Sequence, residues 1–167
     1  VSGAAIGTFH SLCSRIIREN YDLLGISRGF RILSEKETQV LRAESVEELL
    51  DDLYEEGDAD FLRVVSRYTR RGRDDGIARI LYRLHDFSRA KPDPAGWLHY
   101  AAEIPYDAYS LYAGGDTPQI REDYAHTLPD VACLVRTALR FGELYAAKKA
   151  ERSGADYDDL LHMALRV

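Results

Sequence analysis

Apolar residues recur along most of the chain with the spacing of amphipathic helices, and glycine, proline or capping residues interrupt them at regular intervals. Ser34 and Glu37 match a capping box, and Gly25 and Gly57 are placed to end the helices before them. Residues 104–118, which contain two prolines and a glycine pair, are expected to form an ordered loop. The pattern predicts helices over about 11–24, 35–56, 60–71, 75–90, 94–103, 119–128 and 130–152, and from Asp156 onward.

One segment breaks this helical pattern. Ala4-Ala5-Ile6-Gly7 has the small, apolar character of the end of a buried strand, and Thr8-Phe9-His10-Ser11 then opens the first helix. Little else favours a strand. We therefore expect an all-α bundle with one short orphan strand at its N-terminus. A strand without a sheet, and a first residue other than Met, indicate a piece of a larger protein.

Length and composition favour an ordinary globular domain. The chain has 167 residues, of which 46% are hydrophobic, and this is enough to bury a core. It contains no signal peptide and no apolar run long enough to cross a membrane, so we expect a cytoplasmic protein without a membrane partner. Cys13 and Cys133 both fall on apolar helix stripes, which favours buried thiols over a disulfide.

The net charge of −6 conceals a strong segregation of charge. Residues 34–60 carry a net charge of −9, and residues 61–91 carry +6. Four arginines of the predicted basic helix share an arc of about 100°, and a fifth extends this arginine face: Arg63, Arg67, Arg70, Arg71 and Arg73. Guanidinium groups suit phosphate oxygens in any sequence of nucleic acid. The alternative is a solvated face whose counter-charges come from the preceding acidic helix.

Thr8, His10 and Ser11 form a second candidate anion site. Hydroxyl groups at a strand-to-helix junction lie where backbone N–H groups lack partners and the helix dipole favours negative charge. A phosphate could be bound there. The alternative is a helix N-cap followed by one core phenylalanine.

Other chemistries find less support. His85-Asp86 suggests a metal-dependent phosphohydrolase, but the other histidines do not have the spacing of metal ligands. The sequence contains neither Gly-x-Ser-x-Gly nor the phosphate-binding Gly-x-x-x-x-Gly-Lys-Ser/Thr. We therefore predict no catalytic residue, no metal site and no cofactor site in this chain.

Two distant segments together resemble one protein family. Residues 6–20, followed by 30–35, are similar to the first lobe of UvrD/Rep-type superfamily 1 DNA helicases, in which a Thr-Phe-His segment opens a helix before an inserted helical subdomain. Residues 154–161 resemble the Asp-Phe-x-Asp-Leu-Leu segment where that insertion returns to the lobe, with Tyr157 in place of Phe. The middle, including 60–63, 86–89 and 92–97, is most similar to the AddA-type subunit of bacterial helicase–nucleases.

The resemblance implies three parts: residues 1–10 at the edge of a RecA-like lobe, 11–152 as the inserted subdomain, and 153–167 as the return segment. It also implies a parent enzyme that uses ATP and Mg²⁺ to translocate on single-stranded DNA in recombination and repair. Thr8 and His10, with Ser11 adjacent, match the family's contact with the single strand. The arginine face is a separate inference from the residues, for contact with a single-strand or duplex backbone.

The implied partners are DNA, the rest of the helicase chain and a second helicase–nuclease subunit. Two other hypotheses stay open. The chain could be a helical protein–protein docking module that uses its acidic helix, or it could be the metal phosphohydrolase.

Overall fold

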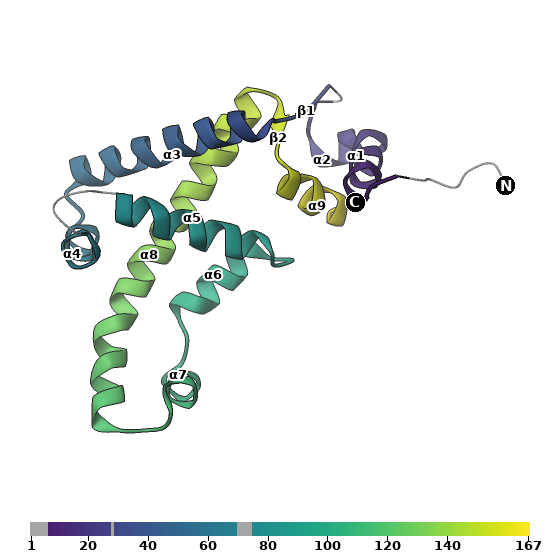
Figure 1. Ribbon diagram of the computed structural model, residues 1–167. Coiled ribbons are helices and arrows are strands. Elements are labelled where there is room, and N and C mark those ends of the chain that lie inside the picture. The colour runs from purple at the N-terminus through teal and green to yellow at the C-terminus, as the bar shows by residue number, and fades with distance from the viewer. Residues whose placement is uncertain (1–6, 28, 70–74) are drawn as a thin grey trace. The chain divides into compact units, whose positions relative to one another are not determined.

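The computed structural model describes residues 7–27, 29–69 and 75–167, and its regular structure there is almost entirely helical (Figure 1). This confirms the all-α prediction. The strand predicted to end at Gly7 falls mostly on residues 1–6, which lie outside the described part. The helices are α1 Phe9–Glu19, α2 Tyr21–Leu24, α3 Glu35–Glu56, α4 Ala59–Tyr68, α5 Asp75–Arg89, α6 Pro94–Ala102, α7 Tyr106–Ala113, α8 Pro118–Glu151 and α9 Tyr157–Leu165.

The described residues divide into two compact units. Unit 1 combines those up to Ser45 with Tyr145–Val167, and unit 2 comprises those within Val46–Leu144. The division falls inside α3 and α8, whereas the resemblance places the edges of the insertion at residues 10/11 and 152/153. Those lobe boundaries stay a prediction, because two compact units do not identify which residues belong to a lobe.

Unit 1 is held together by a short parallel pairing of β1 (Arg31–Ile32) with β2 (Gly154–Ala155). The Leu33 N–H donates to the Ala155 carbonyl over 2.9 Å. A Cβ at Gly154 would come within 2.5 Å of the buried Leu33 side chain, so the close approach of the strands requires glycine there. Residues 31–32, where the hydrophobic pattern did not favour a strand, are therefore one strand of a two-stranded sheet.

The core of unit 1 lies where α1 packs along α9 (Figure 1). Its buried members come from the helices at both ends of the chain and from the β segments: Cys13, Ile17, Phe30, Ala155 and Leu160. In unit 2 the buried side chains include Phe61, Ile77, Leu81 and Phe141. Cys13 and Cys133 are both buried thiols, as predicted.

Three predicted elements differ from the structure. The first predicted helix ends early, because Asn20 donates from its side chain to the Ile16 carbonyl over 2.8 Å and begins the separate α2. The predicted loop at 104–118 contains α7, whose Tyr106 and Tyr109 pack against Tyr124. The two helices predicted around Pro129 are one continuous α8.

Tertiary contacts explain the continuity of α8. Proline removes one backbone hydrogen bond from a helix and crowds the preceding turn. Asp130, the next residue, is only 1% exposed and accepts hydrogen bonds from three side chains of α4. These bonds hold the helix in place directly after Pro129.

The predicted capping box at the start of α3 is present. The Ser34 N–H donates to the Glu37 carboxylate over 2.9 Å, and the Glu37 N–H donates to the Ser34 hydroxyl over 3.4 Å. Arg31 adds an ion pair to Glu37 at 2.7 Å. The hydrogen bond from Ser34 and that from Arg31 lower the pKa of Glu37 from 4.5 to about 2.

We expect the contribution of Glu37 to stability to depend on pH. Its pKa is lowered in the folded chain, so the stabilisation is complete above about pH 4.5 and is lost as the pH falls toward 2. The melting temperature of Glu37→Gln should therefore lie further below that of the parent chain at pH 7 than at pH 2. The same difference at both values would contradict this account. Glu151→Gln, on an exposed side chain, is the control.

Candidate nucleic-acid interface

The first turn of α1 carries the polar residues that the sequence singled out. The Thr8 hydroxyl accepts from the Ser11 N–H over 3.3 Å, and the Ser11 hydroxyl donates to the Thr8 carbonyl over 2.7 Å. Thr8 is therefore the N-cap of the helix. No acidic residue lies in the first turn, so the positive end of the helix dipole is not offset there. Phe9 is 59% exposed, and it is not the core residue of the alternative interpretation.

A cavity of about 850 Å³ extends from this helix start along α1. Its lining residues, all but Ile32 of which carry a polar group, come from α1 with its N-cap, β1 and α9: Thr8, His10, Ser11, Ser14, Arg15, Arg18, Glu19, Ile32 and Tyr157. The structure thus brings the three predicted residues together in one cavity and adds two arginines to them. An anion in this cavity would meet hydroxyl groups, a helix N-terminus and guanidinium groups at once.

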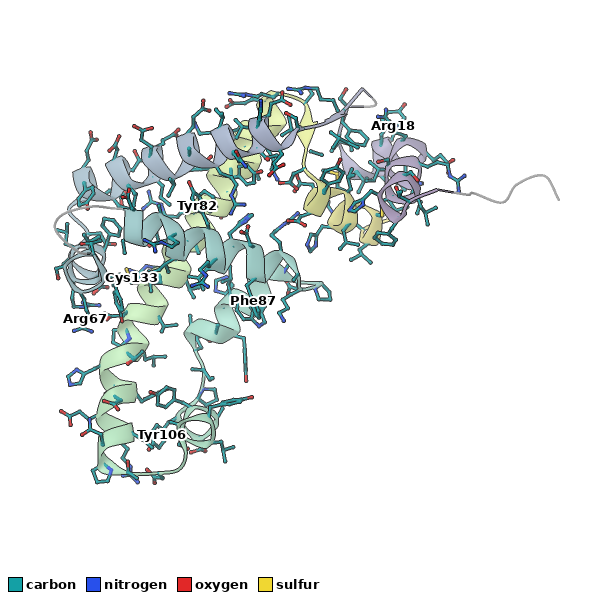
Figure 2. All side chains as sticks on the ribbon, viewed as in Figure 1. Arg18, Arg67, Tyr82, Phe87, Tyr106 and Cys133 are labelled. Atoms are coloured by element: carbon teal, nitrogen blue, oxygen red, sulfur yellow. The ribbon has the colours of Figure 1, made fainter. Side chains whose placement is uncertain are left out.

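The two arginines differ in how they are held. The Arg18 guanidinium lies over the Phe30 ring, 4.9 Å from its centroid, and donates to the Phe30 carbonyl over 3.4 Å. Figure 2 shows Arg18 on the α1 part of unit 1. Within the described part of the chain, Arg15 makes a single long contact, with Glu19 at 4.0 Å between the charged atoms, and about half of its side chain is exposed. Arg15 is thus the more available cation for a ligand.

Tyr157 joins the cavity from the other end of the sequence. Its ring meets the edge of His10, with centroids 4.9 Å apart and planes at 69°. It is 56% exposed, although it is the first residue of α9. An exposed aromatic pair beside cations is a common arrangement for stacking nucleic-acid bases.

A buried ion network fixes the start of α9 and therefore the place of Tyr157. Lys149 is 4% exposed, and its ammonium donates to Asp156 over 2.7 Å and to Asp159 over 2.5 Å. Asp156 and Asp159 also form a reciprocal capping box. The Tyr145 hydroxyl donates to Asp156 over 3.0 Å. The end of α8 and the start of α9 are thereby joined through four polar side chains.

The charges of this network are set by burial and by Lys149. Burial works to raise the pKa of Asp156, but the charge and hydrogen bond of Lys149 outweigh it and lower the pKa to about 2. Burial and the neighbouring Asp156 raise the pKa of Asp159. Burial also raises the pKa of Tyr145, so its hydroxyl stays a donor. One buried ammonium is thus shared by two partly buried carboxyl groups.

The arginine face has a different environment in unit 2. Arg63 donates to Asp130 over 3.3 Å and to Asp60 over 2.5 Å, and Arg67 donates to Asp130 over 2.5 Å. The counter-charges thus come from α4 itself and from α8, and not from the acidic α3 of the alternative interpretation. Both guanidinium side chains keep more than a third of their surface exposed. Arg70, Arg71 and Arg73 lie outside the described residues.

The site residues that the sequence reasoning missed are Arg15, Arg18 and Tyr157. All three lie in the segments that carried the family resemblance, so the pairing of these segments could have indicated them. The described residues offer no set of ligands for the metal-dependent phosphohydrolase that His85-Asp86 suggested. His85 lies 3.5 Å from Asp86, and no cluster of three or more histidine, cysteine or acidic side chains suited to a metal occurs among the described residues.

Comparison with known proteins identifies the family. The family model of the UvrD/REP helicase N-terminal domain matches residues 1–167. The chain belongs to this family. The A subunit of the ATP-dependent helicase/nuclease of Anoxybacillus flavithermus is 37% identical over 155 residues, which are 92% of this chain and 12% of that protein.

Two further relatives of this UvrD/REP helicase chain are helicase/nuclease A subunits as well. The protein of Geobacillus kaustophilus is 32% identical over 170 residues, covering 98% of this chain and 14% of the relative. The protein of Bacillus licheniformis is 40% identical over 107 residues, covering 64% of this chain and 9% of the relative. The chain therefore spans between 9% and 14% of the length of these three relatives.

The relatives are named as ATP-dependent, but the usual phosphate-binding loop for ATP does not occur in this sequence. In many ATP-binding proteins, a Gly-x-x-x-x-Gly-Lys-Ser/Thr loop holds the phosphates of the nucleoside triphosphate, and this sequence contains no such loop. We therefore assign neither ATP nor Mg²⁺ to a side chain of this chain. Among the described residues, no helix is both long enough and apolar enough to cross a membrane.

Replacing Lys149 tests whether the ion network supports unit 1. Lys149→Met leaves two partly buried carboxyl groups without their buried cation, and this should lower the free energy of unfolding by about 3–5 kcal/mol. Lys36→Met, at an exposed position of α3, is the matched control and should change it by less than about 0.5 kcal/mol. Urea unfolding measures both. Equal stabilities of the two variants would show that the network has no structural role.

Proposed function

We propose that this chain is a DNA-binding part of an ATP-dependent DNA helicase that translocates on single-stranded DNA within a helicase–nuclease. Membership of the UvrD/REP helicase family and the similarity to helicase/nuclease A subunits support the reaction class. The cavity at the start of α1 is the observation that carries the proposal for the site. ATP, Mg²⁺ and the work of translocation belong to the rest of the helicase chain. Action in recombination and repair, in the cytoplasm and beside a second subunit, is part of the same proposal.

The α1 cavity suits the backbone of a single strand. A phosphate beside the first turn would meet Thr8, Ser11 and the helix dipole, and Arg15 would supply a full positive charge. The exposed rings of His10 and Tyr157 offer a surface for an unpaired base. A duplex conceals its base faces, so the aromatic part of the site favours a single strand.

The arginine face is the second proposed contact, with Arg63, Arg67, Arg70, Arg71 and Arg73. Two guanidinium groups share the buried Asp130 carboxylate, and Arg63 also meets Asp60. Arg63 and Arg67 therefore also stabilise the fold, because replacing both would leave the buried Asp130 carboxylate without a cation. A test of this face should leave both in place.

Fluorescence anisotropy of labelled oligothymidylate and of a duplex, at low and moderate salt, tests the proposed function. We expect salt-dependent binding, stronger for the single strand. Arg15→Gln should weaken it several-fold and reduce the slope of log K against log salt by about 0.7, since one phosphate contact is lost. Arg166→Gln, at an exposed position near the C-terminus, should leave the affinity unchanged. Equal effects of the two variants would contradict the site.

The same assay measures the contribution of the arginine face separately from that of the α1 site. The triple variant Arg70→Gln, Arg71→Gln, Arg73→Gln spares the Asp130 pairs and should reduce the salt slope if the face contacts DNA. An unchanged slope would remove the arginine face from the interface and leave the α1 site intact. No binding of either oligonucleotide at low salt would contradict DNA binding by this chain.

A protein-docking role is the second candidate, and α7 favours it. Leu111 and Tyr112 on this helix are among the most exposed large apolar side chains of the described residues. Apolar side chains that gather in one exposed patch mark contact surfaces, and these two are neighbours in the sequence. Docking through α7 predicts association that is insensitive to salt and is lost in Leu111→Ser, whereas DNA binding is not affected by that change.

A further inference from the structure

A row of side chains on α5 is separate from both contacts proposed above. Arg79, Arg83 and Phe87 follow one another at intervals of four residues, so they lie within an arc of about 80° and about 6 Å apart along the axis. All three are exposed, while Ile77 and Leu81 on the opposite side of the helix are buried. Neither Arg79 nor Arg83 has a described carboxylate within ion-pair distance. The row thus presents two cations that pair with none of the described carboxylates, followed by an aromatic ring.

The row ends in an aromatic pair with a third cation. Phe87 and Trp97 of α6 have ring centroids 5.1 Å apart, with planes at 53°. The Lys91 ammonium lies 4.6 Å from the Phe87 centroid and 5.7 Å from that of Trp97. Phe87 remains 56% exposed, and Figure 2 shows it at the end of α5 that leads to α6. A large exposed ring beside a cation offers a π-face together with a positive charge.

The neighbouring carboxylates are already engaged. Asp86 lies 3.5 Å from His85. Asp93 caps α6 by accepting the Gly96 N–H over 3.0 Å. The three cations Arg79, Arg83 and Lys91 also outnumber these two carboxylates, so the net charge of this surface is positive.

We propose that Arg79, Arg83, Lys91, Phe87 and Trp97 form a binding track for single-stranded DNA, in which a base stacks on Phe87 and the backbone follows the cations. A row of positive charges combined with a stacking ring is the arrangement by which proteins bind single strands without sequence preference. The inference rests on the proposed function for the class of ligand. Its residues belong to unit 2 and are shared neither with the α1 cavity nor with the arginine face.

Trp97 is the single tryptophan of the chain, so its fluorescence reports on this track alone. Oligothymidylate of 15 nucleotides is titrated into the 167-residue chain while tryptophan emission and anisotropy of the labelled strand are recorded together. We expect quenching that follows the anisotropy. An abasic strand of the same length should quench much less, because it has phosphates but no bases to stack.

Two variants separate stacking from charge. Phe87→Ala should weaken binding at the track by at least about fivefold, which is the lower end of what one stacked base contributes. Leu23→Ala removes an even more exposed apolar side chain, on α2 and outside every proposed contact, and should leave the affinity for the strand unchanged. The double variant Arg79→Gln, Arg83→Gln should reduce the salt slope by about 1.4, since two phosphate contacts are lost. Circular dichroism confirms that each variant is folded.

The outcomes distinguish this track from the proposed function. An increase in anisotropy with no quenching of Trp97, and no effect of the three replacements on α5, would overturn the track and leave DNA binding elsewhere on the chain. No increase in anisotropy would overturn both. Quenching that persists unchanged in Arg15→Gln but falls in Phe87→Ala would establish the track as a separate contact.

Discussion

The buried ammonium of Lys149 is the interaction on which the proposed α1 site depends. It lies between Asp156 and Asp159, where two carboxyl groups are withdrawn from water at the junction of α8 and α9. A charge removed from water is costly unless it is paired, so this arrangement is strongly favoured over separated partners. The reciprocal capping box then fixes the first turn of α9. Tyr157, the residue after the cap, is held beside His10 as a result.

The same junction explains why the interface needs both ends of the sequence. β1 and β2 pair Arg31 with Gly154, which brings the segment after α2 against the segment after α8. α1 and α9 then pack on one another over a common core (Figure 1). His10 and Tyr157 are 147 positions apart in the sequence and yet share a cavity. For the insertion at residues 11–152 that the resemblance predicts, such a closure would keep the two halves of the proposed DNA-binding site together.

Local signals predicted much of the fold, and contacts between distant residues account for most of what they missed. Ser34 and Glu37 lie three positions apart, so their capping box is visible in the sequence. The Thr8 cap and the Gly25 and Gly57 helix ends are equally local.

Asp130 pairs with Arg63 and Arg67 across more than 60 positions, and no periodicity indicates that contact. The continuity of α8 through Pro129 and the formation of α7 against Tyr124 likewise depend on tertiary packing. Of the proposed site, the sequence pointed to Thr8, His10 and Ser11. Arg15 and Arg18 lie four and seven positions after Ser11 on the same face of α1, so helical spacing alone could have indicated them. Tyr157 becomes apparent only once α1 and α9 are together.

Amide hydrogen exchange tests the central claim, that the first turn of α1 together with Tyr157 binds the backbone of a single strand. Exchange is followed with and without oligothymidylate, peptide by peptide, over the described part of the chain. The account predicts slower exchange in peptides covering Phe9–Ser11 and the start of α9 when the strand is bound, at low salt and not at high salt. Slower exchange confined to unit 2, with the first turn of α1 unchanged, would contradict it.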